Sequence, residues 1–330
     1  MDLIERFKQQ ARARLGTIVY PEGEDERILR AASAVAAEGF AKPLVLGQPD
    51  QVAQRAQELQ VSLAGVTVLD GATSARLDQY VRDYAARREG VTEATARRLL
   101  RKPVFYGAAM VAAGDAQAMV AGAAHSTALI IQAAVLLVGF TPGVASPSSF
   151  FIMVLPEYMG EKDKLFIFAD CAVNIDPTTE QLADTAVSAG RNARTLLGLE
   201  PRIAMLSFST KGSAVHPLAD KVIEATRLAR EKAPDVLIDG ELQADSAIVP
   251  KVAARKVKES PVAGQANVLV FPDLDAANIS YKLTQYLAGA KAYGPILQGF
   301  AKPVSDLSRG ASVDDVVAAT AITMAQAQEA

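Results

Sequence analysis

A hydroxyl, a guanidinium and a glycine stand side by side near the end of the sequence, at Ser308, Arg309 and Gly310. The planar fork of an arginine fits two oxygens of a phosphate, and a glycine lets a ligand approach the backbone closely. An apolar helix is expected just after these residues, and its start offers free N–H groups and a positive dipole end. The segment therefore predicts an anion-binding site, although an Arg–Gly pair is also common in surface loops.

Asp315 lies about one turn inside this expected helix, and two interpretations of it stay open. Ser312 and Asp315 have the spacing of a capping box, in which the serine is the N-cap and the acid reaches back to the backbone. The same carboxylate is close enough in sequence to Arg309 to take part in chemistry. Capping and catalysis are compatible only if Asp315 can leave its cap.

Polar residues also follow several expected strands, which is where parallel sheets bind their ligands. Lys211, Gly212 and Ser213 follow an expected strand at 203–208. This segment lacks the first glycine of a phosphate-binding P-loop, and no Gly-x-Gly-x-x-Gly follows the first strand. Neither a nucleotide P-loop nor a nicotinamide fingerprint is therefore predicted, and such polar residues also form turns and N-caps.

Histidine and cysteine are scarce, so few nucleophiles or metal ligands are available. His125 stands beside Ser126 and Thr127, where it could carry a proton or make a hydrogen bond at the entry to a helix. Cys171, the only cysteine, follows an apolar strand with no histidine near it in sequence, which favours a packed thiol over a nucleophile. One cysteine and two histidines predict no metal site.

The composition argues for a soluble protein of two domains. The chain has 330 residues, half of them hydrophobic, which is too long for one ordinary core. Its net charge of -3 is spread along the chain and tryptophan is absent, so no nucleic-acid partner is expected. The apolar run at 128–140 is too short for a membrane span, and the acidic N-terminus is unlike a signal peptide. We therefore expect a cytoplasmic protein without a membrane partner.

Short apolar runs alternate with helical patterns, as is typical of parallel sheets covered by helices. A turn at residues 141–143 marks a domain boundary. Before it we expect strands at 17–20, 43–47 and 66–69 and helices at 25–38, 50–59, 75–88 and 93–100. After it we expect strands at 150–155, 165–168, 203–208, 236–238 and 268–271 and helices at 180–197, 218–232, 241–258 and 276–290.

Seven motifs, in order, resemble signatures of the phosphate acetyltransferase and phosphate butyryltransferase family. They are PEGEDER at 21–27, SFSTKGSA at 207–214, IDGELQ at 238–243, SPVAG at 260–264, FPDL at 271–274, GPILQG at 294–299 and DLSRG at 306–310. The likeness covers essentially the whole chain. It implies reversible acetyl transfer between coenzyme A (CoA) and inorganic phosphate, by way of acetyl phosphate. CoA is then a substrate, and no cofactor is expected.

The resemblance also implies an architecture. We expect an α/β protein of two domains, each a mainly parallel sheet flanked by helices, with the active site in the interdomain cleft. The first domain would be discontinuous, with residues 1–142 plus 298–330, and the second would span 143–297. A homodimer is expected.

Ser308, Arg309 and Asp315 are the catalytic residues that the resemblance implies. The CoA thiolate would attack the acyl-phosphate carbonyl directly, while Arg309 holds the departing phosphate and Ser308 hydrogen-bonds the developing charge. Asp315 would be the base, yet a carboxylate near pKa ~4 would have to take a proton from a thiol near ~8.5, uphill by roughly 6 kcal/mol. Desolvation of the base, or stabilisation of the thiolate by the guanidinium and helix start, would close this gap.

A wider set of residues is expected to bind substrate. It comprises Arg87, Ser126, Thr127, Gln132, Lys211, Gly212, Ser213, Tyr286 and Gly310. Gln132 and Tyr286 stand where the family has phosphate-gripping arginines, and each lost charged hydrogen bond could weaken binding by about 1.5–3 kcal/mol. Lys211 or Lys282 could replace the missing charge. The family's cysteine falls near Tyr158, which leaves no thiol role there.

Three alternatives stay open beside acetyl transfer. The enzyme could prefer butyryl or another acyl chain, which the sequence does not distinguish. The two missing arginines would also suit a non-catalytic relative that binds CoA as a regulatory module. A dehydrogenase of similar architecture is disfavoured by the missing nicotinamide fingerprint.

Overall fold

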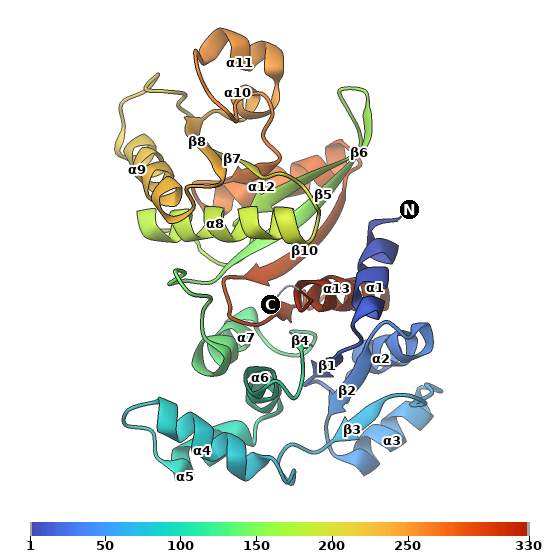
Figure 1. Cartoon of the computed structure of the whole chain (residues 1–330). Helices are drawn as coiled ribbons and strands as arrows, with labels where there is room; N and C mark the ends of the chain where they lie inside the picture. The colour runs from blue at the N-terminus through green and yellow to red at the C-terminus, as the bar shows by residue number, and fades with distance from the viewer. Residues whose placement is uncertain (1, 329–330) are drawn as a thin grey trace. The chain divides into compact units, whose positions relative to one another are not determined.

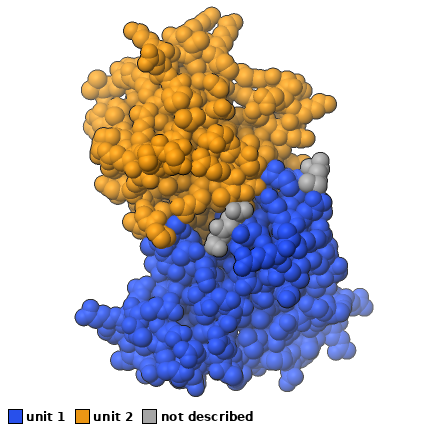
Figure 2. Space-filling view, viewed as in Figure 1, with its two compact units in different colours: residues 1–141, 300–330 blue, residues 142–299 orange. Residues whose placement is uncertain are grey.

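The computed structural model describes residues 2–328, which form two compact units (Figures 1 and 2). Unit 1 consists of residues 1–141 and 300–330, and unit 2 consists of residues 142–299. The predicted boundaries, after residue 142 and before residue 298, lie within two residues of this division. The chain thus leaves unit 1 once and returns to it at its end.

Unit 1 is built on a five-stranded sheet with the order β11-β4-β1-β2-β3, and every neighbouring pair in it is parallel. The strands are β1 (Thr17–Tyr20), β2 (Lys42–Leu46), β3 (Thr67–Leu69), β4 (Ala118–Ala121) and β11 (Val304–Asp306). The return segment of the chain therefore supplies an edge strand, β11, which pairs with β4. Parallel pairing brings the carboxyl ends of all five strands to one edge of the sheet.

The helices of unit 1 follow the strands in sequence. They are α1 (Leu3–Ala13), α2 (Glu26–Glu38), α3 (Pro49–Glu58), α4 (Leu77–Arg87), α5 (Glu93–Leu100), α6 (Pro103–Ala113), α7 (Thr127–Ala133), a π-helical turn η1 (Ala134–Val138) and α13 (Val313–Gln326). Helix α2 shows how local sequence sets their limits. Asp25 caps its start by accepting from the Arg27 amide at 2.9 Å, and Gly39, at φ 66°, ends it.

Strand β1 and helix α13, from opposite ends of the sequence, meet in the core of unit 1. Tyr20, at the end of β1, is fully buried, and its hydroxyl shares a hydrogen bond of 2.7 Å with the Thr320 hydroxyl of α13. Helix α13 packs against α1, α2 and β4. The return segment is therefore an integral part of this core, which fixes the loop between β11 and α13.

Unit 2 contains a six-stranded sheet with the order β10-β5-β6-β9-β7-β8. Its strands are β5 (Ser148–Tyr158), β6 (Glu161–Ala169), β7 (Arg202–Leu206), β8 (Leu237–Leu242), β9 (Val268–Val270) and β10 (Lys291–Gln298). The pairs formed by β6, β9, β7 and β8 are parallel, whereas β5 pairs antiparallel with both β10 and β6. The sheet is thus mainly parallel, with a long antiparallel hairpin at one side.

The helices of unit 2 are α8 (Thr179–Thr195), α9 (Pro217–Lys232), α10 (Ala244–Ile248), α11 (Pro250–Lys256) and α12 (Leu274–Leu287). The single helix predicted at 241–258 is wrong, because β8 runs on to Leu242 and the rest divides into α10 and α11. Pro250 opens α11, and a proline without an N–H cannot continue a preceding helix.

One core cluster of unit 2 contains aromatic and aliphatic side chains from one face of its sheet, among them Phe151, Phe166 and Leu269. Cys171 is fully buried in this cluster, which confirms the packed thiol. Burial raises the pKa of the Cys171 thiol, and the negative charge of Asp170 raises it further. A thiol in that state is a poor nucleophile.

No helix among the described residues is both long enough and apolar enough to cross a membrane.

Candidate functional site

Three neighbouring strands of unit 1 end beside one another. In the register of the sheet, Asp306 at the end of β11 pairs with Ala121 at the end of β4, and β4 also pairs with β1. Three loops therefore emerge at the same edge: 21–25 after β1, 122–126 after β4 and 307–312 after β11. This edge carries Ser308, Arg309, Gly310, Ser126 and Thr127, which the sequence singled out separately.

The loop after β11 presents its predicted residues to the surface. Ser308, Arg309 and Gly310 are all exposed. The Gly310 amide donates to the Ser308 hydroxyl oxygen at 3.3 Å, and the Ala311 amide donates to the Ser308 carbonyl at 2.9 Å. Within the part of the chain that the structure describes, the Arg309 guanidinium has no ion-pair or hydrogen-bond partner, so its donors are available to an anion.

Arg27 of α2 holds the backbone of this loop. Its Nη1 donates to the Arg309 carbonyl at 2.7 Å and to the Ala311 carbonyl at 3.3 Å, while its Nη2 donates to the Ala123 carbonyl at 2.7 Å. Asp25 orients the guanidinium through Nε at 3.0 Å and Nη2 at 2.8 Å. One side chain thus ties the loop after β11 to the loop after β4.

Asp315 is engaged in the cap of α13. Its Oδ2 accepts from the Ser312 amide at 2.9 Å and from the Ser312 hydroxyl at 2.8 Å, while its own amide donates to the Ser312 hydroxyl oxygen at 3.2 Å. The predicted capping box is therefore confirmed. The base role implied for Asp315 stays a prediction.

Ser126 and Thr127 begin α7 on the neighbouring loop. Ser126 is the N-cap, and its hydroxyl oxygen accepts from the Leu129 amide at 3.4 Å. The Thr127 hydroxyl donates to Asp306 Oδ2 at 2.5 Å, which links α7 to the end of β11. Both residues thus reach the same edge of the sheet as Arg309.

The carboxyl group of Asp306 is buried, which disfavours its negative charge. It is 4 % exposed, and its Oδ1 has no hydrogen-bond partner among residues 2–328. Burial raises the pKa of Asp306 to about 6, and the negative charge of Glu22 adds to the rise, although the Thr127 hydroxyl opposes it.

Glu22, in the loop after β1, makes several hydrogen bonds to the loop after β4 at the same edge of the sheet. Its side chain is 1 % exposed, and its two oxygens accept from the amides of Gly122, Ala123 and Ala124 at 2.8–3.0 Å. Glu22 Oε1 also lies 2.8 Å from His125 Nδ1. His125 makes its hydrogen bond just before the start of α7, to Glu22, while Ser126 provides the N-cap. A role of His125 as a proton carrier stays a prediction.

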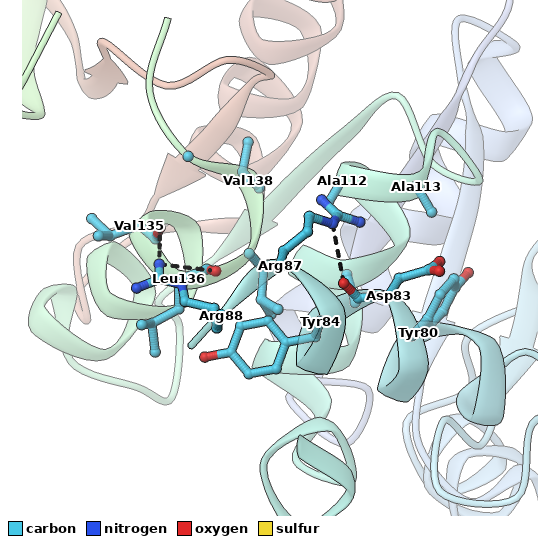
Figure 3. A pocket seen from close by; sticks show the side chains of 13 residues that line it. Tyr80, Asp83, Tyr84, Arg87, Arg88, Ala112, Ala113, Val135, Leu136 and Val138 are labelled. Atoms are coloured by element: carbon cyan, nitrogen blue, oxygen red, sulfur yellow. Dashed lines mark hydrogen bonds between the residues drawn. The ribbon is translucent and has the colours of Figure 1, made fainter. Parts of the chain in front are cut away.

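Arg87 lies at a second place in unit 1, a pocket between α4, α6 and η1 (Figure 3). The pocket has a volume of about 210 Å³ and is also lined by Tyr80, Tyr84 and Arg88. The side chains of Arg87 and Arg88 point in different directions (Figure 3). Arg88 Nη2 donates to the carbonyls of Val135 and Leu136 in η1, each at 3.2 Å. Arg87 Nε donates to the Asp83 carbonyl at 3.2 Å. The rest of the exposed Arg87 guanidinium is available to a ligand.

Gln132 lies on α7, just before the η1 turn that lines this pocket, and is exposed. The chain therefore carries a neutral amide close in sequence to a pocket wall, where the resemblance places an arginine.

In unit 2, Lys211, Gly212 and Ser213 form a closely bonded loop. The Gly212 amide donates to Glu241 Oε1 at 2.7 Å, and the Ser213 hydroxyl oxygen accepts from the Thr210 amide at 3.0 Å. Two of the motifs that carry the resemblance, at 207–214 and 238–243, thus hold each other in place. The Gly212 amide is already used within this loop.

The ammonium group of Lys211 also has partners within unit 2. Its Nζ lies 2.5 Å from Asp239 Oδ1 and donates to the Gly240 carbonyl at 3.0 Å. Burial alone would raise the pKa of Asp239, but the hydrogen bond and charge of Lys211 outweigh it and hold that pKa below its ordinary value. The ammonium group of Lys211 therefore already has a buried acid to neutralise, which makes it a poor substitute for a missing arginine.

Tyr286 lies on α12 and is 80 % exposed. It belongs to an apolar stripe on that helix with Ile279, Leu283 and Leu287, all more than half exposed. Counted from Ile279, these side chains stand at positions i, i+4, i+7 and i+8, which lie on one face of a helix.

Glu22, Arg27 and Asp306 have no role among the sequence-based predictions. A usable signal existed, since the motifs at 21–27 and 306–310 each begin at the end of a strand. Within residues 2–328, no three His, Cys, Asp or Glu side chains are grouped so that they could hold a metal ion.

Residues 2–324 match the model of the family described as Phosphate acetyl/butaryl transferase. A protein named phosphate acetyltransferase from Acetivibrio thermocellus is 46% identical over 330 residues, covering 99% of each chain. One of the same name from Thermoanaerobacterium thermosaccharolyticum is 47% identical, covering 99% of this chain and 100% of the relative. The solved structure of a phosphotransacetylase from Streptococcus pyogenes superimposes with a TM-score of 0.93 at 41% identity, covering 99% of this chain and 98% of that one.

Proposed function

The chain belongs to the phosphate acetyl/butaryl transferase family and is a phosphate acetyltransferase, and we propose that it transfers the acetyl group in one direct step at the loop after β11. In this step the thiolate of CoA attacks the carbonyl carbon of acetyl phosphate, within a complex that holds both substrates. The C–O bond to phosphate breaks as the C–S bond forms. The reverse reaction makes acetyl phosphate from acetyl-CoA and inorganic phosphate.

Arg309 binds the phosphate that leaves. The observation that carries this proposal is its unengaged guanidinium on a loop whose backbone is fixed by Arg27 at 2.7 Å. A fixed arginine fork stabilises the charge that gathers on phosphate oxygens without reorganising in the transition state. Gly310, beside it, leaves room for the phosphate to approach the backbone.

Ser308 and the start of α13 complete the anion site. The Ser308 hydroxyl oxygen already accepts from Gly310, so its hydrogen is free to donate to the oxygen that becomes negative during attack. Asp315 and Ser312 hold the first turn of α13, whose free N–H groups and dipole favour an anion. As the base, the role that the resemblance implies, Asp315 would first have to release its hydrogen bonds from Ser312.

CoA binds through Arg87. An exposed guanidinium beside a pocket of about 210 Å³ suits the phosphate groups of this substrate. Gln132 makes a weaker contact than an arginine would. Ser126 and Thr127, which begin α7 at the same edge of the sheet as Arg309, bind acetyl phosphate. Lys211, Gly212, Ser213 and Tyr286 stay the predicted substrate contacts from unit 2, and Lys211 and the Gly212 amide would first have to release their partners within the loop. That the site lies in the cleft between the two units stays a prediction.

The enzyme acts as a homodimer in the cytoplasm. The apolar stripe of α12 supports the dimer, because four large side chains that are 52–81 % exposed are costly to leave in water. CoA and acetyl phosphate are substrates of cytoplasmic metabolism, which supports the location. Leu283→Glu should lower the mass of the particle in light scattering, whereas the control Leu15→Glu, outside the stripe, should not.

Acetyl phosphate, propionyl phosphate and butyryl phosphate offered separately with CoA test the proposed function. Thioester formation should be fastest with acetyl phosphate. A preference for butyryl phosphate would reassign the acyl chain and keep the chemistry. Binding of CoA by calorimetry without thioester formation from any of the three would overturn the enzymatic function.

A further inference from the structure

Three successive backbone amides of the loop after β4 donate to a single side chain, that of Glu22. The amides of Gly122 and Ala123 donate to its Oε2 at 3.0 and 2.9 Å, and the Ala124 amide donates to its Oε1 at 2.8 Å. The side chain is 1 % exposed, so water has little access to these donors. Buried amides without an acceptor are costly, and successive amides form a natural cradle for one acceptor group. Glu22 therefore fixes the path of residues 122–124.

The same loop is also packed closely against the end of β11. Gly122 has a φ of 109°, and a Cβ atom on it would lie 2.7 Å from the Leu307 amide nitrogen and still closer to Asp306 Oδ1. A residue other than glycine therefore does not fit there. The Leu307 amide also donates to the Ala121 carbonyl at 2.8 Å. The backbone after β4 thus lies directly against the segment that leads to Ser308 and Arg309.

The loop after β4 leads at once into α7. Ser126, the N-cap of that helix, comes two residues after Ala124, the last residue whose amide Glu22 binds. Two residues span about 7 Å at most, so the start of α7 has to follow a shift of the loop. Thr127, the first residue of α7, donates to Asp306 Oδ2 at 2.5 Å, which attaches the helix to the end of β11.

We propose that Glu22 is a positioning residue for acetyl phosphate, whose carboxyl group sets Ser126 and Thr127 in the arrangement that binds this substrate. The inference rests on the proposed function, in which Ser126 and Thr127 bind acetyl phosphate and Arg309 holds the phosphate that leaves. Glu22 is buried and acts through the backbone of the loop. It should therefore affect the KM for acetyl phosphate, and not the KM for CoA, which binds through Arg87.

Glu22→Gln is the variant that tests this role, because it keeps the size and shape of the side chain. A glutamine has one acceptor oxygen, and its NH2 group only donates. Both oxygens of Glu22 accept from backbone amides, so in either orientation the NH2 group would face at least one amide N–H, and the loop would have to move. Glu24→Gln is the matched control, since Glu24 is exposed in the same loop after β1.

E22Q should raise the KM for acetyl phosphate by about 10–10²-fold and lower kcat, since a displacement of about 1 Å at a reacting group can cost about 10²-fold. The KM for CoA should stay at the wild-type value, and E24Q should match wild type throughout. A loss of folded protein alone would lower the apparent kcat and leave both KM values unchanged, so the KM decides even if E22Q folds poorly. Glu22→Asp, whose side chain is one methylene shorter, should show the same selective rise.

Ser126→Ala tests whether Glu22 acts through the start of α7. S126A should itself raise the KM for acetyl phosphate, and the E22Q/S126A double variant should exceed the worse single variant by no more than about twofold, because both changes disturb one contact. Effects that multiply in the double variant, or a wild-type KM for acetyl phosphate in E22Q, would overturn the role of Glu22. A wild-type protein that forms no thioester would instead remove the proposed function, so the two failures are distinguishable.

Discussion

Arg27 and Arg309 are joined by a hydrogen bond of 2.7 Å from the guanidinium of the first to the carbonyl oxygen of the second. The two residues are 282 positions apart in the chain, and the bond fixes the loop that carries the phosphate-binding side chain. The same guanidinium holds the carbonyls of Ala311 and Ala123. Arg27 is therefore a positioning residue for the anion site.

Replacement of Arg27 should lower both the stability of the protein and its kcat. Arg27→Ala removes three hydrogen bonds to carbonyls, and hydrogen bonds from a charged donor contribute about 1.5–3 kcal/mol each. We expect kcat to fall by at least tenfold, since a displacement of about 1 Å at a reacting group can cost about 10²-fold. Steady-state kinetics measures this loss. Arg30→Ala, on the same helix, is the control, and equal kcat values for the two variants would contradict the positioning role.

The capping box at Ser312 and Asp315 makes a separate prediction about stability. Ser312→Ala and Asp315→Ala remove the same cap from opposite ends, so each should lower the free energy of unfolding by about 1 kcal/mol. Asp315→Asn should keep more of that stability because its amide oxygen can still accept. Urea denaturation measures all three. A neutral effect of Ser312→Ala would show that the cap adds nothing to the stability of α13.

Asp306 should make the stability of the protein depend on pH. Its pKa in the folded state is raised from 3.8 to about 6, so the folded protein binds the proton more tightly than the unfolded chain. The resulting stabilisation is complete below about pH 3.8 and is lost as the pH rises through about 6. The loss is about 3 kcal/mol at neutral pH, from a shift of roughly two units at 1.36 kcal/mol each.

Asp306→Asn isolates this effect, because asparagine keeps an acceptor for Thr127 and carries no charge. Relative to wild type, the variant should gain unfolding free energy between pH 4 and pH 7.5, as followed by urea denaturation at a series of pH values. A difference that does not change with pH would mean that the buried acid does not titrate as described.

Gln132 offers a gain-of-function test of CoA binding. Gln132→Arg should restore a charged contact near the Arg87 pocket and lower the KM for CoA by about tenfold, equivalent to about 1.4 kcal/mol. The KM for acetyl phosphate should stay the same. Arg87→Ala should shift the KM for CoA in the opposite direction. If Q132R leaves the KM for CoA where it is in wild type, Gln132 does not contact CoA.

Local patterns were sufficient for much of the fold. The expected strand at 17–20 and helix at 93–100 coincide with β1 and α5, because their apolar spacing and flanking residues are unambiguous. Strands β4, β10 and β11 were not predicted. β4 and β11 have only three or four residues, β4 is half alanine, and β10 contains Gly294 and Pro295. Such strands form through their place in the sheet and carry little local signal.

The candidate site likewise contains residues that could be predicted from the sequence and contacts that could not. Arg309, Gly310 and the cap at Asp315 could be recognised from adjacent residue types. The contacts that unite the site could not, since Arg27 meets Arg309 and Thr127 meets Asp306 across 282 and 179 residues. The order of strands β11, β4 and β1 determines which of these residues meet, and no local sequence pattern encodes that order.

The most direct test of the central claim is thioester formation from acetyl phosphate and CoA by wild-type protein and by Arg309→Ala, with Arg255→Ala as a surface control. Wild type and the control should form acetyl-CoA at equal rates, and Arg309→Ala should lose about 10²–10³-fold in kcat. Its free energy of unfolding should change by less than about 0.5 kcal/mol, because the side chain is exposed. An Arg309→Ala protein with wild-type kcat and an unchanged KM for acetyl phosphate would contradict the account.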